Sequence, residues 1–221
     1  MYRSQVEQLL ANIEGAHENY YASGVFSGPS LYFHQRALKD SLNGDVGKFA
    51  ESSYAMLAAW GMHRMGKGGA KMTDFSTYEK SLQRAWSAIC DLRSVSATSL
   101  RATDWIRLGE AFLEIKAMQS AFSLVANSKV LAHAVPNLVP PVDRQYTIRF
   151  LHGSKQLPKK IEDEWSLLRG FLENFFYPVV RDDRFTKVYE GWCEVESTFP
   201  WNTSALKTVD NILVGHMRGN V

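Results

Sequence analysis

Lys129 and Asp143 are the two residues whose types and surroundings could do chemistry. Lys129 lies in the apolar segment SLVANSKVLAHAV, and Asp143 follows fourteen residues later, directly after Pro-Pro-Val. Apolar surroundings remove solvation from the ammonium form of a lysine, so its pKa falls and the amine becomes a usable nucleophile. An ionised aspartate nearby would stabilise a developing positive charge. The two residues are therefore a candidate reacting pair.

Each residue also has a purely structural explanation. Lys129 could lie at the edge of a half-buried helix, with its stem on apolar surface and its ammonium group in water. Asp143 could be the N-cap of a helix that begins with RQYTIRF, since aspartate is a preferred N-cap residue. The helix dipole and the free amides would keep such a carboxylate ionised. For Asp143, the structural role of N-cap and the chemical role of charge stabiliser are compatible with each other.

The elements that would position this pair are expected to be helices. Apolar residues recur at helical spacing through most of the chain, and two-residue alternation is almost absent apart from the weak run TKVYEGW. The expected helices are Val6–Ile13 with Ser4 as N-cap, Leu31–Leu42, Lys48–Met62, Ser76–Leu92, Asp104–Ala126, Ser128–Ala134, Asp143–Leu151, Leu157–Val180 and 202–217. The pattern predicts an all-α, multi-helix globular fold, with residues 1–221 as one domain or as two lobes with a cleft between them.

Composition narrows the class of protein. A formal net charge of +2 permits an anionic partner without requiring one. Two distant cysteines exclude a cysteine-only zinc or iron–sulfur site within this chain and give no disulfide framework. The N-terminal segment has no apolar core typical of a signal peptide, and no stretch is long enough to span a membrane. We expect a cytoplasmic protein with no cofactor, no metal and no membrane partner, and the oligomeric state stays open.

Two segments carry a resemblance to a known family. LVANSKVLAHAV resembles the second half of a helix-hairpin-helix element, and VPPVD resembles the proline-rich loop that ends in an aspartate. KFAESSYAMLAAWGM resembles an early buried helix of the same family. Together they resemble the helix-hairpin-helix base-excision DNA glycosylases, especially the 8-oxoguanine glycosylase branch, over residues 48–151. The family hairpin usually reads Gly-x-Gly-x-Lys, whereas this chain has Val-Ala-Asn-Ser-Lys.

The resemblance implies a fold element, an activity and a set of site residues. It implies a helix-hairpin-helix-like element followed by a Pro-rich loop, and DNA as the partner. Lys129 would be the nucleophile, and Asp143 would stabilise charge at the sugar carbon. The candidates for contact with DNA or with the flipped base are Asn127, Ser128, His133, Arg144, Trp60, Arg64 and Lys67. Phe150 and Trp192 are further candidates for a stacking wall, although aromatic residues of this kind more often belong to the core.

The basic loop HRMGKGGAK, which contains Arg64 and Lys67, has two interpretations. It lacks the Gly-Lys-Ser/Thr order of a P-loop. It could be a solvated loop, or it could contact phosphates and position DNA without reading its sequence. His133 lies one helical turn after Lys129, so it could share the same pocket or simply be a core histidine.

The sequence leads to two hypotheses of different classes. The first is a bifunctional DNA glycosylase and AP lyase that excises an oxidised purine through a Schiff base on Lys129. The second is a non-enzymatic all-α scaffold that binds DNA or protein. A buried pocket that holds both Lys129 and Asp143 would favour the enzyme. Side chains that point apart would remove its mechanism.

Overall fold

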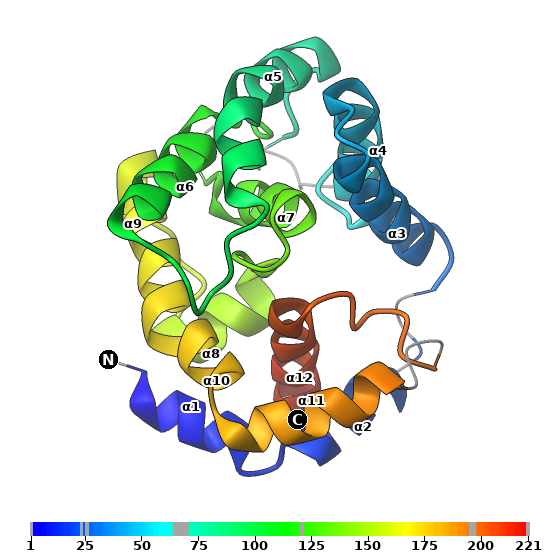
Figure 1. The fold of residues 1–221 in the computed structure, drawn as a ribbon, viewed down its shortest axis with the longest axis vertical. Coiled ribbons are helices and arrows are strands. Elements are labelled where there is room, and N and C mark those ends of the chain that lie inside the picture. The colour runs from blue at the N-terminus through cyan, green and yellow to red at the C-terminus, as the bar shows by residue number, and fades with distance from the viewer. Residues whose placement is uncertain are drawn as a thin grey trace.

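Helix α7 is enclosed by α3, α4, α6 and α9 in the computed structural model of the chain (Figure 1). The structure describes residues 2–22, 24, 27–63, 71–119, 122–194 and 198–219, and within these ranges the fold is all-α without strands. The helices are α1 (Arg3–Leu10), α2 (Ile13–Ala22), α3 (Pro29–Leu42), α4 (Val46–Ala59), α5 (Phe75–Leu92), α6 (Ala102–Glu114), α7 (Leu124–Ala134), the π-helical turn η1 (Arg144–Ile148), α8 (Arg149–His152), α9 (Ile161–Phe171), the π-helical turn η2 (Leu172–Phe176), α10 (Tyr177–Val180), α11 (Asp183–Glu194) and α12 (Ala205–Gly219).

The expected single helix from Asp104 to Ala126 is wrong, because α6 ends at Glu114 and α7 begins at Leu124. Ile115 leaves the helical conformation, with φ −64° and ψ 123°. The chain then runs beside residues 71–73, where Met118 forms an isolated antiparallel bridge with Met72. Tertiary pairing of this segment overrides its helical pattern. The interruption separates α6 from α7.

Several other boundaries follow from local signals. The expected end of α3 at Asn43-Gly44 is confirmed, since Gly44 has a positive φ of 77° that ends the helix without steric cost. Asp45 caps α4 through its side chain, which accepts a hydrogen bond of 3.1 Å from the backbone N–H of Lys48. The expectation of a Ser4 cap is wrong, because Ser4 lies inside α1. The strand-like run TKVYEGW lies inside α11.

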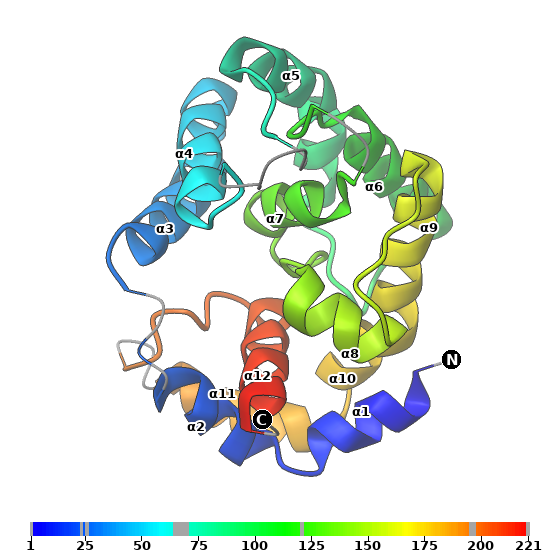
Figure 2. The same ribbon diagram turned by 180° about the vertical axis from the view of Figure 1, so that it is seen from behind.

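The two ends of the chain pack against each other. Helix α12 makes its most extensive contact with α2, and both views show the two helices side by side (Figures 1 and 2). A small cluster of Tyr20, Trp201 and Val214 joins them, separate from the main core, and Trp60 and Tyr146 pack against its edge. This cluster brings the last helix of the chain next to the end of α4 and to η1.

In the part of the chain that the structure describes, no helix combines the length and the apolar character needed to cross a bilayer.

Candidate active site

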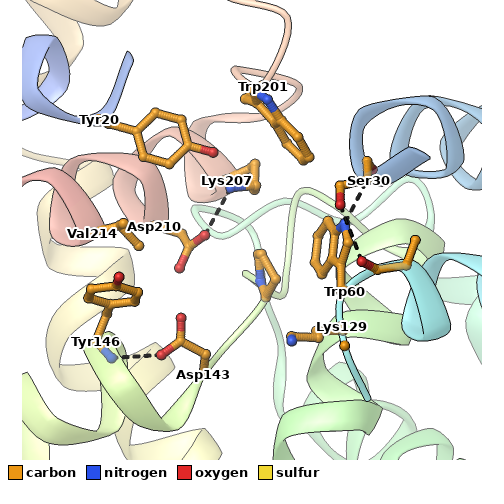
Figure 3. A pocket seen from close by; sticks show the side chains of 13 residues that line it. Tyr20, Ser30, Trp60, Lys129, Asp143, Tyr146, Trp201, Lys207, Asp210 and Val214 are labelled. Atoms are coloured by element: carbon orange, nitrogen blue, oxygen red, sulfur yellow. Dashed lines mark hydrogen bonds and ion pairs between the residues drawn. The ribbon is translucent and has the colours of Figure 1, made fainter. Parts of the chain in front are cut away.

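A pocket of about 440 Å³ lies where α2 and α12 face α4, α7 and η1 (Figure 3). It receives polar side chains from α7, from the loop before η1 and from α12, and aromatic side chains from four other positions. Its lining residues are Tyr20, Ser30, Ala59, Trp60, Gly61, Lys129, Pro141, Asp143, Tyr146, Trp201, Lys207, Asp210 and Val214. Lys129 and Asp143 therefore open into one cavity.

Lys129 is held in the middle of α7, a helix in which every residue is buried. Only 9% of the lysine is exposed. Its Nζ lies 5.4 Å from the centre of the Trp60 ring and donates to Met62 Sδ at 3.8 Å. Burial lowers the pKa of Lys129, while the charges of Asp143 and Asp210 oppose that shift. The amine is thus desolvated in the way that nucleophilic lysines require.

Asp143 is the N-cap of η1, as its sequence context predicts. Its Oδ1 accepts a hydrogen bond of 2.7 Å from the backbone N–H of Tyr146. The first turn is wide, because the N–H of Ile148 donates to the Asp143 carbonyl at 2.9 Å. The cap directs the carboxylate into the pocket, and π-helical turns of this kind often occur at functional sites.

Ser128 holds the loop that carries Asp143 against the helix that carries Lys129. Its Oγ accepts a hydrogen bond of 3.1 Å from the backbone N–H of Val142, which directly precedes Asp143. The same hydroxyl donates to Val125 O within α7. One buried serine therefore ties the loop of Asp143 to the residue next to Lys129.

Helix α12 supplies a second pair of charges, which the sequence analysis did not identify. Lys207 Nζ donates to Asp210 Oδ2 at 2.9 Å and also to Asn211 Oδ1. Within the described ranges, Asp210 Oδ1 is buried and has no hydrogen-bond partner. Burial raises the pKa of Asp210 to about 6, against the opposing charge of Lys207. A signal was present in the sequence, since the polar residues at positions 207, 210 and 211 are spaced to share one side of the helix.

Aromatic rings enclose the charged groups. The rings of Trp60 and Trp201 lie 6.1 Å apart, and Lys207 Nζ lies 5.5 Å from the centres of both the Tyr20 and Trp201 rings. Tyr146 closes the side near Asp143 (Figure 3). Such walls suit a flat, uncharged ring that is partly polar at its edge.

Behind the two tryptophans lies a directed chain of buried histidines. His133 Nδ1 donates to the carbonyl of Lys129 at 2.7 Å, so its Nε2 accepts from His34 Nδ1, also at 2.7 Å. His34 Nε2 then accepts from Thr203 Oγ1 at 3.0 Å. Burial lowers the pKa of both imidazoles, that of His133 to about 4, so both are neutral at pH 7. The chain links α7, α3 and the segment before α12.

The other expected site residues do not all reach the pocket. Trp60 lines it, and His133 lies behind it as part of the histidine chain. Asn127 is fully buried and its amide donates to Phe112 O and Ile115 O, both at 2.9 Å, at the end of α6. The side chains of Asn127 and Ser128 are buried and form hydrogen bonds with backbone groups, and neither residue lines the pocket. Arg144 stacks over the Phe122 ring at 5.1 Å, outside the pocket.

The remaining candidate site residues are Arg64, Lys67, Phe150 and Trp192. Arg64 and Lys67 lie outside the described residues. Phe150 packs against Phe175, and Trp192 stacks on His17 at 3.8 Å between ring centres. Neither ring lines the pocket, and Trp201 takes the place expected for a second aromatic wall.

The N-terminus of α7 is already occupied by a carboxylate. Glu164, a buried residue of α9, accepts a hydrogen bond of 2.6 Å from the backbone N–H of Leu124 at its Oε2. Burial raises the pKa of this carboxyl, and hydrogen bonds from the start of α7 oppose the shift. The positive end of the helix is therefore neutralised from within the protein.

Comparison with protein-family models, with curated proteins and with solved structures finds no match for this chain.

Proposed function

We propose that this protein is a DNA glycosylase and AP lyase that uses Lys129 as its nucleophile and excises an oxidised purine. The observation that carries the proposal is the shared pocket of Lys129 and Asp143, with the lysine buried and its pKa lowered. In this proposal α6 and α7 form the helix-hairpin-helix-like element. The loop that ends at Asp143 is its Pro-rich loop. The aromatic walls of Trp60 and Trp201 suit a base that has left the stack.

The chemistry would begin with the neutral amine of Lys129. Its lone pair forms a bond to C1′ of the sugar, and the glycosidic C1′–N bond breaks with its electron pair on the departing base, which takes up a proton. Asp143 stabilises the positive charge that develops at C1′. The attached nitrogen loses a proton, O4′ takes one up, and the sugar ring opens to give a protonated Schiff base. Loss of a C2′ proton then expels the 3′ phosphate and cleaves the strand.

Contact with the DNA backbone would differ from the phosphate contact that a glycine-rich hairpin makes. Glu164 fills the N-terminus of α7, where backbone N–H groups would otherwise meet a phosphate. Phosphate contact would therefore come from other parts of the surface. The same observation favours the second hypothesis, a binding scaffold without chemistry, which predicts a pocket that binds a ligand and forms no covalent intermediate.

Borohydride trapping tests the proposal. The protein is mixed with duplex oligonucleotides that carry an abasic site or 8-oxoguanine, and the Schiff base is reduced to a stable complex. We expect a covalent band with wild type and with the exposed control Lys187→Gln on α11, and no band with Lys129→Gln. A wild-type protein that gives no band on either duplex overturns the enzyme and leaves the scaffold.

A further inference from the structure

We propose that Asp210 and Lys207 form a subsite that recognises the lactam edge of a nucleobase, an N–H group beside a C=O group. The inference rests on the proposed function in naming a base as the ligand, and it concerns residues outside the Lys129 and Asp143 pair. It assigns to α12 the selection of the base, and to α7 the reaction at the sugar.

Asp210 offers the pocket an unused hydrogen-bond acceptor. Asp210 is 6% exposed, and its Oδ2 is bonded to Lys207. Its Oδ1 is buried with no hydrogen-bond partner in the described part of the chain, although the residue lines the pocket. A buried carboxylate oxygen without a partner is costly, and a ligand N–H group would remove that cost.

Lys207 provides a hydrogen-bond donor beside that acceptor. The Lys207 ammonium has three protons, and the oxygens of Asp210 and Asn211 accept two of them. The third can be donated to a ligand oxygen. The ion pair thus presents one acceptor and one donor side by side, which is the complement of an N–H and C=O edge.

The shape and charge of the surroundings favour a flat, neutral ligand. The rings of Tyr20 and Trp201 lie on either side of the lysine end of the pair, each at 5.5 Å. Lys207 and Asp210 carry opposite charges, so their ion pair is neutral as a whole and a neutral ligand edge fits it better than an ion. A flat neutral ring with a lactam edge meets all three conditions. Guanine, hypoxanthine, uracil and 8-oxoguanine have such an edge, whereas adenine does not.

The substitution Asp210→Asn tests this subsite. The amide oxygen can keep the bond to Lys207, and the amide N–H₂ group then faces the pocket where an acceptor is needed. The volume hardly changes, so folding should be preserved, and circular dichroism with thermal unfolding checks it. Asp183→Asn on the exposed start of α11 is the matched control.

Two readouts separate this inference from the proposed function. The first compares borohydride trapping on an abasic duplex, which has no base to recognise, with single-turnover excision from duplexes containing 8-oxoguanine, hypoxanthine or uracil. We expect Asp210→Asn to trap the abasic duplex within about two-fold of wild type and to lose about 10- to 100-fold in excision of the accepted base, the range of a lost hydrogen bond to a charged group. Equal loss on both substrates, or no loss on either, overturns the subsite.

The second readout is equilibrium binding of nucleosides, followed by the change in tryptophan fluorescence, to which Trp60 and Trp201 of the pocket contribute. We expect guanosine, inosine or 8-oxoguanosine to bind wild type and the Asp183→Asn control more tightly than adenosine, and Asp210→Asn to abolish the preference. Binding of 8-oxoguanosine alone would assign the edge created by oxidation. Preserved preference in the variant, or equal binding of adenosine, overturns the inference. A protein that binds with this preference but traps nothing would keep the subsite and remove the glycosylase.

Discussion

Gly215 in α12 lies directly against the backbone of Ala16 in α2, so that a Cβ at position 215 would come within 1.8 Å of the Ala16 carbonyl oxygen. The backbone N of Tyr20 would lie 2.8 Å from the same Cβ. This close approach of two helices brings Tyr20 over Lys207. The glycine therefore helps to build one wall of the pocket from residues at opposite ends of the chain.

Gly215→Ala is expected to destabilise the protein by more than about 3 kcal/mol, since the added methyl meets rigid backbone and α2 must move. Gly170→Ala in α9 is the matched control, because a Cβ there meets nothing within 4 Å. It should stabilise the protein by about 0.5–1 kcal/mol through helix propensity. Urea denaturation measures both, and equal effects at the two positions would contradict the close contact.

Asp143 combines a structural cap with a charge, and two substitutions separate these roles. Asp143→Asn keeps a good N-cap side chain and should change the free energy of unfolding by less than about 0.5 kcal/mol. Asp143→Ala should lose about 1 kcal/mol of stability. Both should reduce the rate of Schiff-base formation by about 100-fold or more, because both remove the negative charge. Single-turnover trapping measures the rate, and an unaffected rate in Asp143→Asn would exclude an electrostatic role.

The buried histidines make stability depend on pH. Burial lowers the pKa of His133 to about 4 and that of His34 well below its ordinary value of 6.5. Between pH 6.5 and 4 the unfolded chain binds protons that the native chain does not, so the free energy of unfolding falls as the pH falls. Asp210, whose pKa is raised to about 6, takes up a proton in the native state in this window and offsets part of the loss.

Comparison of wild type with His133→Asn isolates the histidine contribution, because the other titrating groups are common to both proteins. The stability difference in favour of wild type should shrink by up to about 3 kcal/mol from pH 7 to pH 4. Urea denaturation at unit intervals of pH measures it. Parallel stability curves for the two proteins would show that His133 is not held neutral by burial.

Glu164 is expected to stabilise the start of α7 mainly as a hydrogen-bond acceptor. Glu164→Ala leaves the N–H of Leu124 buried without its partner and should cost about 1–3 kcal/mol. Glu164→Gln retains an acceptor oxygen and removes a buried charge, so its stability should stay within about 1 kcal/mol of wild type. Thermal unfolding at pH 7 compares the two. A larger loss in the glutamine variant would mean that the charge itself is required.

The sequence predicts the part of the site that local patterns encode. An apolar segment around Lys129 predicts a buried lysine, and Pro-Pro-Val followed by Asp143 predicts a helix cap. Both residues line the pocket. Their proximity depends on the hydrogen bond between Ser128 and Val142, which spans only fourteen residues. Local sequence therefore suffices for this half of the site.

The other half depends on contacts between distant segments. Trp201, Lys207 and Asp210 reach the pocket only because α12 packs against α2 near the start of the chain. The spacing of residues along the sequence does not predict the packing of α12 against α2. The break between α6 and α7 depends on such a contact too, since pairing of Met72 with Met118 interrupts a sequence pattern that is helical throughout.

Locating the borohydride-reduced adduct within the protein tests directly whether Lys129 is the nucleophile. Lys129 and Lys207 both line the pocket, so a trapped band alone does not say which lysine reacted. Proteolysis of the complex formed on an abasic oligonucleotide, followed by mass spectrometry of the modified peptide, identifies the residue. We expect the adduct on Lys129. An adduct on Lys207, or no adduct at any lysine, would contradict it.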